Sequence, residues 1–112
     1  MKDKSELKLD GRIAFYAILF DRFKKTAADL GYALTVHGSM ASDMDLIAIP
    51  WTEEAVEAEV LVKAISDEMG PTIWKDYHIA EKANKPHGRV AYTLSWYSDW
   101  FIDLSIMPLK NT

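Results

Sequence analysis

The chain has 112 residues, the size of one ordinary domain, so we expect residues 1–112 to fold as a single domain around one core. Hydrophobic residues make up 49% and charged residues 27%, which is the balance of a globular protein and excludes a disordered chain. The formal net charge of −4 argues against tight binding to duplex nucleic acid, and the absence of cysteine excludes disulfides and cysteine nucleophiles.

The N-terminal segment MKDKSELKLDGR is charged throughout and lacks the apolar core and cleavage site of a secretory signal. The longest apolar run, IAFYAILF, is eight residues long, whereas a membrane-spanning helix needs about 20. We therefore expect a cytoplasmic protein that does not interact with a membrane.

Helix and strand patterns alternate through the first half of the chain. Apolar residues recur at spacings of three and four between Asp10 and Leu30, which predicts a helix with Asp10 as its N-cap and Gly31 at its end. The stretches ALTVHGS and MDLIAIPW then read as two short strands joined by a tight turn of small residues.

A second helix is expected from Thr52, which suits an N-cap, to Gly70, with an apolar stripe between them. After it we expect a strand over 73–79, a polar loop EKANKPHG, and a hairpin formed by RVAYTLSW and WFIDLSIMP. The order α-β-β-α-β-β-β predicts an α+β domain in which two helices pack on a mixed or antiparallel sheet of about four to five strands.

Three carboxylates stand where charge is unexpected. Asp43 and Asp45 open the second strand and share one face of it, and Asp103 lies inside an apolar strand, where an unpaired charge is costly. These acids predict a metal site, and oxygen ligands without His or Cys favour Mg²⁺ or Mn²⁺. The alternative is that Asp43 closes the turn after Gly38 and Ser39, while Asp45 lies in solvent at a strand end.

This arrangement resembles the nucleotidyltransferase superfamily of DNA polymerase β, in its minimal, nucleotidyltransferase-like form. The features that carry the resemblance are a strand that ends in Gly-Ser, a Ser-Asp-x-Asp-Leu motif that opens the next strand, and a later strand with one more acid: Gly38 and Ser39, Ser42 to Leu46, and Asp103. The chain is also similar to small bacteriophage-encoded proteins, which would place it in the cytoplasm of the host.

The resemblance implies a reaction and a set of site residues. Asp43, Asp45 and Asp103 would be the catalytic residues that hold two Mg²⁺ ions, and the nucleotide phosphates would contact the turn that contains Gly38, Ser39 and Ser42. The implied activity is transfer of a nucleoside monophosphate from a nucleoside triphosphate to the hydroxyl of an unknown acceptor. A non-catalytic nucleotide-sensing or protein-binding module and a metal-dependent nuclease remain open as alternatives, as does a homo-oligomer or a protein partner.

A short basic segment is a further candidate for triphosphate binding. Lys85, His87 and Arg89 would share one face if this segment were extended; otherwise it is a solvated basic loop. If a two-residue turn joins the last two strands, Leu94 lies opposite Asp103 and Arg89 lies on the other face of the sheet. A shift of one residue reverses that placement.

Overall fold

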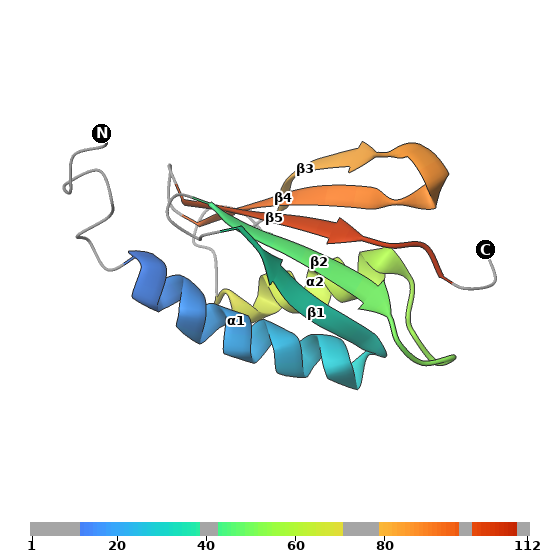
Figure 1. Ribbon diagram of the computed structural model, residues 1–112. Coiled ribbons are helices and arrows are strands. Elements are labelled where there is room, and N and C mark those ends of the chain that lie inside the picture. The colour runs from blue at the N-terminus through green and yellow to red at the C-terminus, as the bar shows by residue number, and fades with distance from the viewer. Residues whose placement is uncertain (1–11, 39–42, 71–78, 97–99, 110–112) are drawn as a thin grey trace.

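The computed structural model describes residues 12–38, 43–70, 79–96 and 100–109. The fold is α+β, with its elements in the order α1, β1, β2, α2, β3, β4, β5, as expected, and both helices lie on one side of the sheet (Figure 1). Within these residues, no helix is both long enough and apolar enough to cross a membrane.

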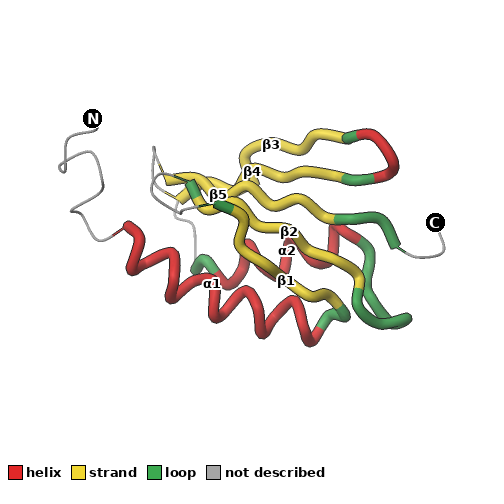
Figure 2. The backbone as a smooth tube through the Cα atoms, in the orientation of Figure 1, coloured by secondary structure: helices red, strands yellow, loops and turns green. Residues whose placement is uncertain are grey.

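The sheet is mixed, and the strand from the C-terminal part of the chain lies at its centre (Figure 2). Its strand order is β1-β2-β5-β4-β3, with β2 and β5 parallel and the other neighbours antiparallel. The bounds are α1 (Arg12–Asp29), β1 (Tyr32–His37), β2 (Met44–Pro50), α2 (Ala58–Glu68), β3 (Ile79–Asn84), the 3₁₀ turn η2 (Pro86–Gly88), β4 (Val90–Trp96) and β5 (Trp100–Ile106).

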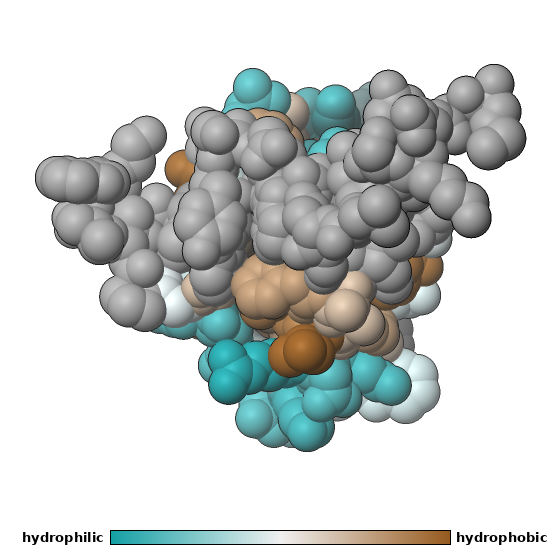
Figure 3. Space-filling view, turned by 90° about the vertical axis from the view of Figure 1, so that its left-hand side faces the viewer, coloured by the Kyte–Doolittle hydropathy of each residue, from teal (hydrophilic) through white to brown (hydrophobic). Residues whose placement is uncertain are grey.

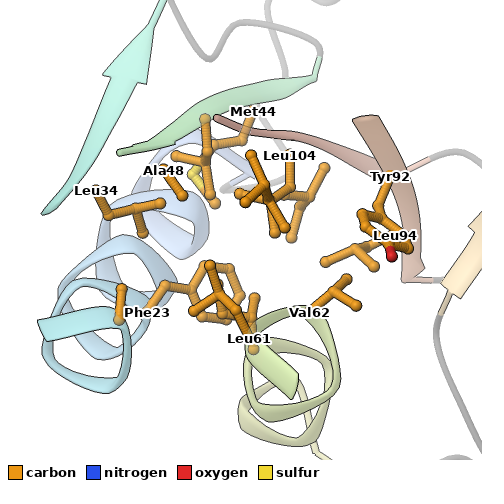
Figure 4. Packing of buried hydrophobic residues seen from close by; sticks show 14 of the residues in the cluster. Phe23, Leu34, Met44, Ala48, Leu61, Val62, Tyr92, Leu94 and Leu104 are labelled. Carbon is orange, nitrogen blue, oxygen red and sulfur yellow. The ribbon is translucent and has the colours of Figure 1, made fainter. Parts of the chain in front are cut away.

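The core lies between the sheet and the two helices. Phe23 of α1 and Leu61 of α2 point toward Leu104 of β5 and its neighbours (Figure 4). The strands β1, β2, β4 and β5 send alternate side chains into this core, so the other set lies on the opposite face, which we call the open face because no described helix covers it. On the side of the helices, hydrophilic residues gather at the bottom of the molecule (Figure 3).

The second helix begins later than the sequence predicts, and Thr52 is not its N-cap. α2 begins at Ala58 with Glu57 in the N-cap position. The backbone N–H groups of Trp51 and Thr52 instead donate to the carbonyl of Gly31, and that of Val56 donates to Leu30. These bonds hold the preceding segment against the end of α1 and keep it out of the helix.

The expected polar loop EKANKPHG is wrong in its first half, because Ile79–Asn84 forms the edge strand β3. The strand has few apolar residues because it lies at the edge, where side chains such as Glu81 and Lys82 are exposed. Residues 71–78, which contain nearly all of the expected strand over 73–79, lie outside the described residues.

Two buried tyrosines provide a matched test of the core. Tyr32 Oη donates a hydrogen bond of 2.7 Å to the carbonyl of Val56, whereas Tyr92 Oη is buried without a partner among the described residues. Tyr32→Phe should lower the free energy of unfolding by about 1 kcal/mol, because it leaves a carbonyl without its donor. Tyr92→Phe should be neutral or stabilising in the same urea titration; an equal loss in both variants would contradict this account.

Candidate functional site

Asp45, near the start of β2, lies directly opposite Asp103, in the middle of the parallel strand β5. The register pairs Asp45 of β2 with Asp103 of β5, and both residues alternate with buried neighbours, so their side chains share the open face. The two carboxyl groups are close enough to form a hydrogen bond when Asp45 is protonated. The sheet therefore brings together two acids that are far apart in the sequence.

The environment of Asp45 disfavours its negative charge. Partial burial raises the pKa of this carboxyl above its ordinary value of 3.8; the hydrogen bond to Asp103 and the negative charges of Asp103 and Asp43 raise it further. His37, which pairs with Asp45 from the other side, lowers the pKa again. The pair thus has an unbalanced negative charge that a proton or a cation would neutralise.

The third expected acid, Asp43, lies next to this pair and acts on Asp45 through its charge. Across the described residues, no three side chains of His, Cys, Asp or Glu form one group that could hold a metal ion. The structure therefore shows a pair of carboxylates with Asp43 nearby, and metal binding by all three acids stays a prediction.

The predicted phosphate-binding turn is described only at Gly38, since Ser39 and Ser42 lie outside the described residues. Gly38 has a φ of 94° and follows the last residue of β1. A Cβ built on it would lie 3.7 Å from Asp45 Oδ2, so the backbone passes close to the acid pair. This closeness agrees with a ligand that contacts both the turn and the carboxylates.

Thr93 supports Asp103 from the neighbouring strand, a contact that the sequence interpretation missed. The register of β4 and β5 pairs Thr93 with Asp103, one residue away from the two-residue-turn alternative, which paired Leu94 with it. Thr93 Oγ1 donates a hydrogen bond of 3.1 Å to Asp103 Oδ1. In the sequence YTLSW the polar residues Thr93 and Ser95 alternate with larger ones, which indicates that the two share one face of β4. Whether that face is also the face of Asp103 depends on the register between β4 and β5.

We expect Thr93→Val to lower the free energy of unfolding by about 1 kcal/mol, because the substitution keeps the shape of the side chain and removes the donor to a carboxylate. Thr93→Ser keeps the donor and is the matched control for the lost hydroxyl. Urea unfolding of both variants at neutral pH measures the difference. Equal stability of the valine variant and the wild type would show that the hydrogen bond contributes nothing.

Arg89 lies on the open face, the same face as Asp103. This placement follows from the observed register, which differs by one residue from the register of a two-residue turn. Its Nη1 donates a hydrogen bond of 3.0 Å to Ser105 Oγ, and Ser105 is the next residue after Asp103 on this face of β5. Lys85 and His87 are exposed around the 3₁₀ turn η2, where His87 has a φ of 66°. The segment is therefore not extended, and it forms the exposed basic loop that the sequence left as the alternative to a shared face. The structure therefore brings Arg89 toward the acids, but not Lys85.

Three hollows on the surface lie away from the acid pair. One of about 430 Å³ is lined by Ile49, Trp51, Met107 and Pro108, where β2 and β5 end. Another of about 490 Å³ lies between the start of α2 and the turn η2. The third, of about 240 Å³, lies along the edge of β1. Asp45 and Asp103 line none of the three; they are on the open face, near the start of β2 and in the middle of β5.

No protein-family model matches the chain, and no curated protein matches it.

Proposed function

We propose that the chain is a metal-dependent nucleotidyltransferase that moves a nucleoside monophosphate from a nucleoside triphosphate to an acceptor hydroxyl. The observation that carries the proposal is the pairing of Asp45 with Asp103 across two parallel strands, where burial and the charge of Asp103 raise the pKa of Asp45. A divalent cation relieves this repulsion, and hard oxygen donors of this kind favour Mg²⁺ or Mn²⁺.

In this proposal Asp45 and Asp103 hold the metal, and Asp43 adds a third carboxylate. The cation supplies neutralisation of triphosphate charge and a lower pKa for the acceptor hydroxyl. The acceptor oxygen bonds to the α-phosphorus, the bond from that phosphorus to the β-phosphate oxygen breaks, and pyrophosphate leaves with that oxygen while the hydroxyl proton passes to water. Arg89, beside Ser105 on the same face, offers a guanidinium to the phosphates.

The same residues support a second candidate, a nucleotide-sensing module that binds without catalysis. Only Met40 and Ala41 separate Ser39 from Ser42. This segment is shorter than the corresponding turn in minimal members of the superfamily that the chain resembles. A shorter turn offers fewer backbone N–H groups to a triphosphate, which favours binding without productive alignment. Both candidates require the acid pair, and they differ in whether nucleotide is transferred.

Ligand-induced stabilisation tests the shared part of both candidates. Saturating Mg²⁺ with one of the four nucleoside triphosphates should raise the unfolding midpoint by several degrees, since ligand at about 100 times its Kd adds about 2.7 kcal/mol. The rise should disappear in Asp45→Asn and in Asp103→Asn, and it should persist in Asp67→Asn, an exposed aspartate on α2. An equal rise in all four proteins would exclude the acid pair as the binding site.

Transfer itself is measured with nucleoside triphosphates that are radiolabelled at the α-phosphate. We expect label to pass onto RNA, protein or the chain itself only with Mg²⁺ or Mn²⁺, and to fall at least about a hundredfold in Asp103→Asn. Metal-dependent binding without any transfer would favour the sensing module. No binding and no transfer would exclude both candidates.

A further inference from the structure

We propose that two copies of this chain associate through the outer edge of β1, which joins their sheets into one. β1 and β3 are the two edge strands of the sheet, and the features that prevent edge pairing occur only on β3 among the described residues. β3 has a register irregularity between Ile79 and Glu81 and carries exposed Glu81 and Lys82. Such bulges and charges block the addition of another strand.

The outer edge of β1 is suited to pairing. β1 is paired without interruption to β2 from Tyr32 to His37, and its sequence YALTVH has no proline, lysine or carboxylate. Trp51 N donates to the Gly31 carbonyl, which fixes which residues bond to β2 in the antiparallel ladder. Because bonded residues alternate, the N–H and C=O groups of Tyr32, Leu34 and Val36 point away from the sheet.

A second copy of β1 matches these groups when it runs antiparallel. In the register that pairs the outward-pointing residues of one copy with those of the other, Leu34 lies opposite Leu34 of the other copy. Tyr32 then lies opposite Val36 on either side of this pair. Beside this edge lies the hollow of about 240 Å³, whose lining includes Ala28, Leu34 and Trp51. Trp51 is 77% exposed in the single chain, and a partner strand in this position would cover part of it.

The helix beside this edge is also complementary to itself. Ala17, Asp21, Lys24 and Ala28 are exposed and follow one another at helical spacing, and Lys24 and Ala28 line the hollow at the edge of β1. A twofold axis between Asp21 and Lys24 pairs each aspartate with the lysine of the other copy, and pairs Ala17 with Ala28. The small alanines allow close approach at both ends of this surface.

Both complementary surfaces can share one twofold axis. α1 and β1 run in opposite directions and pack together, joined by the turn at Leu30 and Gly31 (Figure 1). The midpoint between Asp21 and Lys24 lies about 11 Å along the helix from this turn. Leu34 lies about 10 Å along the strand from the same turn. Strand pairing and charge pairing therefore point to the same closed dimer, a second copy of this chain.

Charge variants test this dimer by mixing. In sedimentation equilibrium the wild type should have twice the chain mass of 12.7 kDa, and Asp21→Lys and Lys24→Asp should each raise the dimer Kd by about tenfold or more, since each places like charges together. An equimolar mixture of the two variants should restore the dimer, because both contacts across the twofold axis then join a lysine of one variant to an aspartate of the other. Lys63→Asp, in an exposed ion pair on α2, should leave association unchanged.

Hydrogen exchange gives a readout that needs no variant. The amides of Tyr32, Leu34 and Val36 should become protected as the protein concentration rises, whereas those of the β3 edge should not. A wild type that stays at 12.7 kDa at every concentration would overturn the proposal. So would a mixture of the two charge variants that remains monomeric, or a dimer whose β1 amides exchange as fast as those of the monomer.

Discussion

Gly31→Ala is expected to lower the free energy of unfolding by about 3 kcal/mol or more and the unfolding midpoint by about 10 °C. Gly31 has a φ of 91°, a backbone angle that residues other than glycine rarely adopt. A Cβ added here would lie 2.6 Å from Ala55 Cα and 2.8 Å from Thr52 Oγ1. Its carbonyl also accepts the N–H groups of Trp51 and Thr52. The new methyl group therefore pushes against backbone that the same residue holds in place.

Gly88→Ala is the matched control, because Gly88 also has a positive φ, of 80°. There the nearest atom to an added Cβ is Pro108 Cβ at 3.2 Å, a side chain close to the end of the described residues. We expect a loss of about 1 kcal/mol from backbone strain alone. Thermal unfolding of both variants separates the two contributions, and equal losses would show that contact with Ala55 adds nothing.

Local sequence patterns predict most of the elements of this fold. The three- and four-residue spacing between Asp10 and Leu30 anticipates α1, and the apolar alternation anticipates β1, β2, β4 and β5. The predicted start of α2 at Thr52 was wrong. Thr52 and the glutamates after it favour a helix locally, whereas long-range hydrogen bonds to Leu30 and Gly31 hold this segment in another conformation. Such bonds leave no local pattern in the sequence.

The candidate site is predictable only in its residues. Asp45 and Asp103 stand out because they interrupt apolar strands, but their contact depends on β5 inserting beside β2 in parallel, which no local pattern specifies. The position of Arg89 depends on one residue of register between β4 and β5, and residues 97–99, which join these strands, lie outside the described residues. Thr93 and Ser105 enter the site only once that register is known.

The neighbours of Asp45 lead to a dependence of stability on pH. Its pKa is raised in the folded protein, chiefly by burial and then by Asp103, so the folded state binds this proton more tightly than the unfolded state. From about pH 4, near the unfolded pKa, up through the raised pKa, unfolding releases a proton, and the free energy of unfolding falls as pH rises. The stabilising contribution is complete below the unfolded pKa and is lost as pH rises through the raised pKa of the folded state.

Asp45→Asn removes this charge and keeps the size of the side chain, so we expect the variant to be more stable than the wild type at pH 7 without metal, by about 2–4 °C in unfolding midpoint. The advantage should shrink as pH falls through the raised pKa and disappear below about pH 4, where the wild-type carboxyl is protonated in both states. Asp67→Asn, on the exposed surface of α2, should show no comparable gain. A gain from Asp45→Asn that grows toward acid pH would contradict the repulsion between Asp45 and Asp103.

Divalent metal should reverse this order of stability, which connects the pH experiment to the proposed function. Saturating Mg²⁺ or Mn²⁺ would neutralise the two carboxylates once the proton has left, so it should stabilise the wild type most at neutral pH and the asparagine variant little. Because metal and proton compete for the same oxygens, the metal effect should weaken as pH falls through the raised pKa of Asp45. A metal effect of equal size in both proteins would place the ion elsewhere, and the acid pair would then act as a site for a proton alone.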